Sequence, residues 1–204
     1  MSEPSSIGSM RPGRYGIAGP PQVFLRRIHS GLVWNLQGVP DNPALIRQLQ
    51  DLWGIDHLPQ PHRARNYGAF QLLWIGPKSW LVFDRDAARP SEQAAALGIA
   101  DFRDRIQAAG GALFDVSAGR VGWRVSGPRA QDLLASACAL DLHPSVFRPD
   151  SCAQSLFGHV SALYHRLSED DFAIHVARSF AVDVWEALCA SAAQYGYEVV
   201  ESGA

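Results

Sequence analysis

The chain has few cysteines and almost no lysine. Its 204 residues contain three cysteines, and Cys138, Cys152 and Cys189 lie far apart with no Cys-x-x-Cys pair. This spacing argues against a disulfide framework and supplies no zinc ligand set, and it fits a reducing cytoplasm. Lys78 is the sole lysine, so arginine carries nearly all of the positive charge. Arginine suits buried and subunit-facing positions better than lysine, although a genomic bias in composition would produce the same pattern.

An excess of charge of one sign and long hydrophobic runs are also lacking. The formal net charge is −2, so no basic field exists to attract nucleic acid. No run of about 18 apolar residues predicts a membrane span. Residues 1–21 are rich in Ser, Gly and Pro without the apolar segment of a signal peptide, and we expect them to form a flexible N-terminal arm. We therefore expect a cytoplasmic protein that binds neither nucleic acid nor a membrane.

After this arm, one order of elements is expected twice. In the first pass we expect, in order, a strand at 31–36, a helix starting at 41–43, strands at 69–75 and 80–83, a helix at 99–109 and a strand at 112–116. The first helix is indicated by Asn42-Pro43 and by apolar residues at three- and four-residue spacing up to Trp53. Leu81-Val82-Phe83 is apolar at consecutive positions, so we expect that strand to be covered on both sides.

The second pass repeats the order. We expect a strand at 121–125, a helix beginning at Pro128, strands at 153–160, 162–167 and 172–176, a helix capped by Ser179 and ending at Gly196, and a strand at 197–200. The first pass reads β-α-β-β-α-β, and the second is interpreted as the same order with one additional strand between its helices. The sequence therefore predicts an α+β fold of two ferredoxin-like lobes, 22–117 and 118–204, with mainly antiparallel sheets and helices on one face.

Several short motifs follow one another at a characteristic spacing from about residue 70 to residue 196. They are Ile75-Gly76-Pro77-Lys78-Ser79-Trp80-Leu81-Val82, Asp115-Val116-Ser117, Arg120-Val121 running on to Ser126-Gly127-Pro128, Leu140-Asp141-Leu142-His143-Pro144, Cys152-Ala153-Gln154, His165-Arg166 and Arg178-Ser179-Phe180-Ala181. Taken together, this ordered set resembles the gamma subunit of heterotetrameric sarcosine oxidase.

The resemblance implies a fold similar to the folate-binding aminomethyltransferase of the glycine cleavage system. It also implies an accessory, non-catalytic subunit whose partners are alpha, beta and delta subunits. The whole complex converts sarcosine to glycine, hydrogen peroxide and 5,10-methylenetetrahydrofolate, with FAD, FMN, NAD and tetrahydrofolate held by other subunits and no cofactor held by this chain. Two alternatives stay open, namely an independent folate-binding or aminomethyl-transferring protein and a stand-alone interaction module.

No catalytic, cofactor-binding or metal-ligating residue is predicted from the motifs. Cys152 reads as an inert packed thiol, because nothing in the sequence supplies the base that a nucleophile requires. Asp115 is expected to cap the turn that follows its strand. The glycines at 119, 122 and 127 do not have the spacing of a phosphate loop.

Four residues are candidates for a subunit interface, namely Trp80, His143, His175 and Arg178. For His143, which lies in a turn, a bond to nearby backbone, a contact with the alpha subunit and proton transfer stay open. His175 alternates with apolar neighbours along its strand, so we expect it to face solvent or a neighbouring chain. Tryptophan and arginine are frequent at interfaces, although core packing explains most of the six tryptophans.

Overall fold

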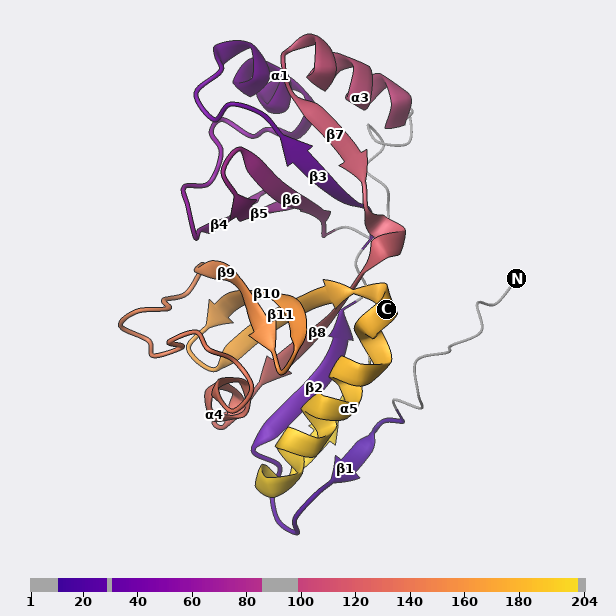
Figure 1. The fold of residues 1–204 in the computed structure, drawn as a ribbon, viewed down its shortest axis with the longest axis vertical. Helices are drawn as coiled ribbons and strands as arrows, with labels where there is room; N and C mark the ends of the chain where they lie inside the picture. The colour runs from indigo at the N-terminus through magenta and orange to yellow at the C-terminus, as the bar shows by residue number, and fades with distance from the viewer. Residues whose placement is uncertain (1–10, 29–30, 86–98, 202–204) are drawn as a thin grey trace, which may run out of the picture. The chain divides into compact units, whose positions relative to one another are not determined.

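A computed structural model describes residues 11–28, 31–85 and 99–201 of the chain (Figure 1). It divides into two units. Unit 1 comprises the described residues of Met1–Ile28, Val121–Pro149 and Gln154–Ala204, and unit 2 comprises those of His29–Arg120 and Asp150–Ala153. No helix in the described ranges is long and apolar enough to cross a membrane.

Unit 2 is built on a five-stranded sheet with the order β4-β5-β6-β3-β7, in which all neighbours are antiparallel. Its elements are β3 (Val33–Gln37), α1 (Pro43–Trp53), β4 (Ala64–Tyr67), β5 (Phe70–Gly76), β6 (Ser79–Asp84), α3 (Ile99–Ala108) and β7 (Ala112–Asp115). Without β4, the order β5-β6-β3-β7 is that of a ferredoxin-like sheet. The predicted β-α-β-β-α-β order is therefore present, and β4 is an additional edge strand that the sequence did not predict.

Local signals determine where α1 begins and ends. The side chain of Asn42 accepts a hydrogen bond from the backbone N–H of Ala44 (3.0 Å), and Pro43 occupies the first turn, where its missing N–H is not needed. Gly54 follows the helix with φ of 69°, the left-handed conformation that terminates helices. The predicted helix start is confirmed.

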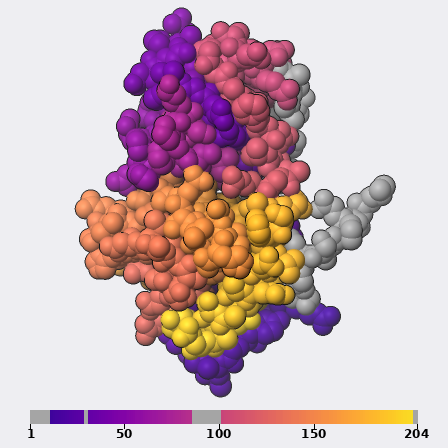
Figure 2. Space-filling view, viewed as in Figure 1, coloured from indigo at the N-terminus to yellow at the C-terminus, as the bar shows by residue number. Residues whose placement is uncertain are grey.

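The core of unit 2 lies between its sheet and the helices α1 and α3. Trp34 of β3 stacks on Trp53 of α1 with ring centroids 5.5 Å apart, and Phe102 of α3 packs against the same indole at 5.9 Å. The helices lie side by side at the surface of this unit (Figure 2). Leu81, Val82 and Phe83 are all buried, so the expectation that both faces of β6 are covered is confirmed.

Unit 1 contains a seven-stranded sheet with the order β1-β12-β2-β8-β11-β10-β9. Its elements are β1 (Gly13–Tyr15), β2 (Val23–Ile28), β8 (Arg120–Ser126), α4 (Ala130–Ala135), β9 (Cys152–Phe157), β10 (Val160–Ser168), β11 (Asp171–Ala177), α5 (Ala181–Ala192) and β12 (Tyr197–Val199), with short 3₁₀ turns at Arg178–Phe180 and Ala193–Tyr195. A further 3₁₀ turn, Ser117–Gly119, belongs to unit 2. The elements of the second pass are present, but three strands, β9, β10 and β11, lie between α4 and α5, so this pass has one strand more than the order β-α-β-β-α-β, with β9 at the edge of the sheet. However, β2 is inserted between β8 and β12, antiparallel to the former and parallel to the latter.

The observed units differ from the expected lobe boundaries at three places. The stretch 22–28 was assigned to the first lobe, yet β2 belongs to the sheet of unit 1. Within the expected N-terminal arm, Gly13–Tyr15 forms β1 and pairs with β12, while residues 1–10 lie outside the described residues. Asp150–Ala153, expected in the second lobe, belongs to unit 2. For β1 and β2, strand pairing over long sequence distances overrides proximity along the chain. For Asp150–Ala153, an isolated bridge joins Ser151 to Arg63 of unit 2.

Two helix starts in unit 1 also differ from expectation. The helix expected at Pro128 begins at Ala130. Ser179 is not a helix cap, because Arg178–Phe180 forms a 3₁₀ turn and α5 begins only at Ala181, without a side-chain cap. Phe180 is exposed, so it does not share the buried face of Val184 and Leu188.

Candidate functional site

The motif Asp115-Val116-Ser117 forms a structural link inside unit 2. The carboxylate of Asp115 accepts hydrogen bonds from the backbone N–H of Ser117 (2.9 Å) and from its hydroxyl (2.6 Å). The same hydroxyl oxygen accepts a bond from the N–H of Val33 on β3 (2.9 Å). The prediction that Asp115 caps the turn is confirmed. Through Ser117, its carboxylate also helps to hold the end of β7 beside β3.

Arg166, from the motif His165-Arg166, holds a loop in unit 1. The residue is 1% exposed, and its guanidinium donates to the carbonyl oxygens of Leu142 (2.9 Å), Phe147 (2.9 Å), Ser168 (3.0 Å) and Glu169. Burial lowers the pKa of this guanidinium. The carbonyls compensate for the lost water, so the motif ties the loop after α4 to the turn between β10 and β11.

Cys152 is a packed thiol. It is fully buried, its S–H donates to the carbonyl of Trp74 (3.4 Å), and burial raises its pKa to about 12. Because the thiolate is the reactive form, a thiol with this pKa is unreactive at neutral pH. The prediction that Cys152 is inert is supported by this environment.

The four candidate interface residues lie in different settings. The prediction that Trp80 contacts a partner at the surface is wrong. The residue is 2% exposed, and its indole N–H donates to the carbonyl of Pro59 (3.0 Å) within the core of unit 2. His175 is 3% exposed, so the expectation that it faces solvent is wrong. Its ring lies against Gly122, where an added Cβ would come within 2.6 Å of Nδ1. Strand alternation identified the face on which His175 lies, but it could not show that this part of the face is covered.

His143 and Arg178 are both exposed. The backbone N–H of His143 donates to the carboxylate of Asp141 (2.9 Å), and its ring Nδ1 lies 2.8 Å from the hydroxyl of Ser145. These short-range bonds orient the ring within its turn. Arg178 lies at the start of the 3₁₀ turn before α5. Both residues stay predictions as partner contacts.

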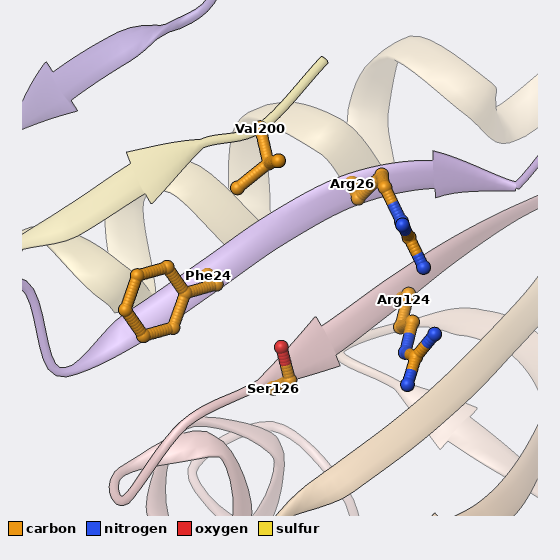
Figure 3. A pocket seen from close by; sticks show the side chains of 5 residues that line it. All are labelled: Phe24, Arg26, Arg124, Ser126 and Val200. Carbon is orange, nitrogen blue, oxygen red and sulfur yellow. The ribbon is translucent and has the colours of Figure 1, made fainter. Parts of the chain in front are cut away.

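A surface feature that sequence reasoning missed lies on the sheet of unit 1. Phe24, Arg26, Arg124, Ser126 and Val200 line an open hollow of about 300 Å³ (Figure 3). Arg26 of β2 and Arg124 of β8 are direct cross-strand neighbours. The alternation along 121–125 does predict that Arg124 points away from the core. Arg26 could not be placed beside it, because β2 was assigned to the other lobe.

The charges around the hollow are unequally compensated. Arg124 binds Asp171 through two guanidinium nitrogens, with Nε 2.8 and 2.9 Å from the two carboxylate oxygens. This hydrogen bonding raises the pKa of Arg124. Among the described residues, none forms a hydrogen bond or ion pair with the guanidinium of Arg26. Within the same ranges, no three His, Cys, Asp or Glu side chains gather to hold a metal ion.

Residues 38–194 match the model of the sarcosine oxidase, gamma subunit family. The chain belongs to this family. The sarcosine oxidase subunit gamma of Corynebacterium sp. (strain P-1) is 30% identical over 110 residues, which cover 53% of this chain and 50% of that relative. The chain thus matches about half the length of this curated gamma subunit.

Two solved structures share the fold of this gamma-family chain. Heterotetrameric sarcosine oxidase from Corynebacterium sp. U-96, in complex with pyrrole 2-carboxylate, matches with a TM-score of 0.71 and 23% identity over 88% of each chain. The glycine cleavage system aminomethyltransferase T from Bartonella henselae matches with a TM-score of 0.59 and 17% identity, over 85% of this chain and 49% of that one. The predicted α+β fold, similar to the aminomethyltransferase, is confirmed.

Proposed function

We propose that this chain is an accessory, non-catalytic gamma subunit of a heterotetrameric sarcosine oxidase. The observation that carries the proposal is the family match over residues 38–194, which includes the motifs described above. In these motifs, the polar groups of Asp115, Arg166 and Cys152 bond to the chain's own backbone. Groups bound in this way stabilise a shape and are not presented to a substrate.

The partners in this proposal are alpha, beta and delta subunits. The assembly carries out the oxidative demethylation of sarcosine in the cytoplasm, and it forms glycine, hydrogen peroxide and 5,10-methylenetetrahydrofolate. FAD, FMN, NAD and tetrahydrofolate are assigned to the other subunits. The gamma chain contributes packing surface, which helps to keep the one-carbon intermediate inside the complex until it reaches folate.

The test is to produce the other subunits with and without this chain. We expect the complete complex to have the larger mass and to couple sarcosine oxidation to methylenetetrahydrofolate formation. We expect the complex without this chain to assemble poorly or to release more free formaldehyde. If particle size and coupling are unchanged when the chain is omitted, the proposal is wrong.

The isolated chain provides a second test. It should not turn over sarcosine when tetrahydrofolate and an electron acceptor are supplied, because the proposal assigns the cofactors to other subunits. Calorimetry with tetrahydrofolate should show no micromolar binding. Micromolar binding would instead favour an independent folate-binding protein of the same fold.

A further inference from the structure

The hollow on the sheet of unit 1 places two positive charges side by side. Arg26 and Arg124 are paired residues on the neighbouring antiparallel strands β2 and β8, and Figure 3 shows both side chains on the side that bears the hollow. Like charges at directly opposite positions destabilise a sheet. A carboxylate beside the two arginines would offset this repulsion.

Asp171 provides that charge for Arg124 but not for Arg26. Both carboxylate oxygens of Asp171 accept hydrogen bonds from Arg124, and the aspartate side chain is 12% exposed. Glu198 of β12 is paired with Phe24 in the sheet register, but its carboxylate binds Arg14 (3.0 Å). Both carboxylates are therefore bound to other arginines, and Arg26 has no carboxylate partner among the described residues.

The walls of the hollow specify more than charge. Phe24 and Val200 supply apolar surface beside Arg26, and Val200 is 37% exposed. Ser126, the cross-strand neighbour of Phe24, adds a hydroxyl. Arginine and aromatic side chains together are typical of the residues that dominate binding at protein interfaces. The open form of the hollow suits a protruding side chain better than a small molecule, which proteins usually enclose.

The backbone around the hollow is already paired. β2 lies between β12 and β8 and is hydrogen-bonded to both, so no strand of a partner can add at this position. Binding at the hollow must therefore use side chains.

We propose that this hollow receives an aspartate or glutamate side chain, with an adjacent apolar residue, from another subunit of the assembly. The carboxylate binds Arg26, and the apolar neighbour packs on Phe24 and Val200. This inference rests on the proposed function, because it takes the occupant to be a partner subunit. It goes further by naming the contact surface and the chemistry of the contact.

The first experiment compares Arg26→Glu with Arg47→Glu. Arg47 is an exposed arginine of α1 and makes no ion pair among the described residues, so it is a matched control. Arg26→Glu should raise the dissociation constant for the remaining subunits about tenfold or more, since it places a carboxylate against a carboxylate. Arg47→Glu should leave it unchanged within about twofold, and Arg26→Lys, which keeps the charge, should lose less than Arg26→Glu.

The stability of the isolated chain should not fall with Arg26→Glu, although the same change should weaken assembly. Arg26→Glu replaces a repulsive cross-strand pair by an attractive one beside Arg124, so its thermal unfolding midpoint should stay the same or rise. A residue with only a structural role would lose assembly and stability together. Weaker assembly with undiminished stability therefore supports a contact surface, whereas a lowered midpoint contradicts the inference.

A photo-crosslinking amino acid in place of Phe24, in the complete assembly, identifies the occupant. We expect a crosslink to a peptide of another subunit that contains Asp or Glu. Two results would overturn the inference and leave the proposed function standing. One is that crosslinks form only within this chain, and the other is that Arg26→Glu and Arg47→Glu have equal dissociation constants. If the wild-type chain does not associate with the other subunits at all, the proposed function itself fails and this inference fails with it.

Discussion

Replacement of Arg166 tests the view that a family motif serves to hold a loop. The side chain bonds to four carbonyls, and those of Leu142 and Phe147 belong to buried residues, whereas Ser168 and Glu169 are exposed. In Arg166→Ala, water can reach the two exposed carbonyls, but the two buried ones lose their donor. Each buried acceptor left unsatisfied costs about 1–3 kcal/mol.

The alanine variant also loses the packing of the guanidinium over Phe172, at 4.9 Å from the ring centroid. Together these losses predict a destabilisation of about 3–5 kcal/mol. Arg166→Lys should cost about 2 kcal/mol, since one ammonium keeps the charge but cannot span carbonyls in a plane as the guanidinium does. Urea unfolding followed by circular dichroism measures both values.

The matched control is Arg148→Ala. Arg148 is exposed, and within the described ranges its side chain makes one hydrogen bond, to the carbonyl of Ser145 (3.3 Å). Its loss should therefore change the free energy of unfolding by less than about 0.5 kcal/mol. If Arg166→Ala were destabilised no more than Arg148→Ala, the loop-holding role derived from the structure would be refuted.

Two further predictions concern a cysteine and a glycine. Alkylation at pH 8 should label Cys138, which is partly exposed, whereas Cys152 should react only after unfolding. If Cys152 in the folded chain were labelled as fast as Cys138, its burial would be contradicted. Folding raises the pKa of Cys152 from 9.0 to about 12, so between these pH values the thiol loses its proton in the unfolded state but keeps it in the folded state. Its contribution to stability should therefore fall as pH rises from 9 towards 12. Urea unfolding at a series of pH values, compared with Cys152→Ala, measures this fall. Gly122→Ala should lower stability by about 1–3 kcal/mol because its Cβ would lie 2.6 Å from His175 Nδ1. Gly119→Ala should be nearly neutral, because no atom of the described residues would lie within 4 Å of its Cβ, and equal thermal midpoints for the two variants would contradict the contact with His175.

The sequence predicted best those features that local residues determine. The start of the first helix was predicted correctly because Asn42 and Pro43 act within one turn of that end. Consecutive apolar residues in β6 were enough to show that both of its faces are covered. The cap at Asp115 was predictable for the same reason, since its bonds reach only two residues along the chain.

Features that depend on distant segments could not be predicted. The place of β2 is set by pairing with β8 and β12, which follow it by about 100 and 170 residues. The charged hollow depends on that pairing, so Arg26 was not recognised. The role of Arg166 depends on loop carbonyls of Leu142 and Phe147, which no side-chain pattern reveals.

The position of β2 has a consequence for biosynthesis. β2 leaves the ribosome well before one of its two neighbours, because β12 follows it by about 170 residues and ends at Val199. Until that strand is made, one hydrogen-bonding edge of β2 has no neighbour, and unpaired edges promote aggregation. A nascent chain halted before residue 197 should therefore depend on chaperones to a greater extent than the finished polypeptide.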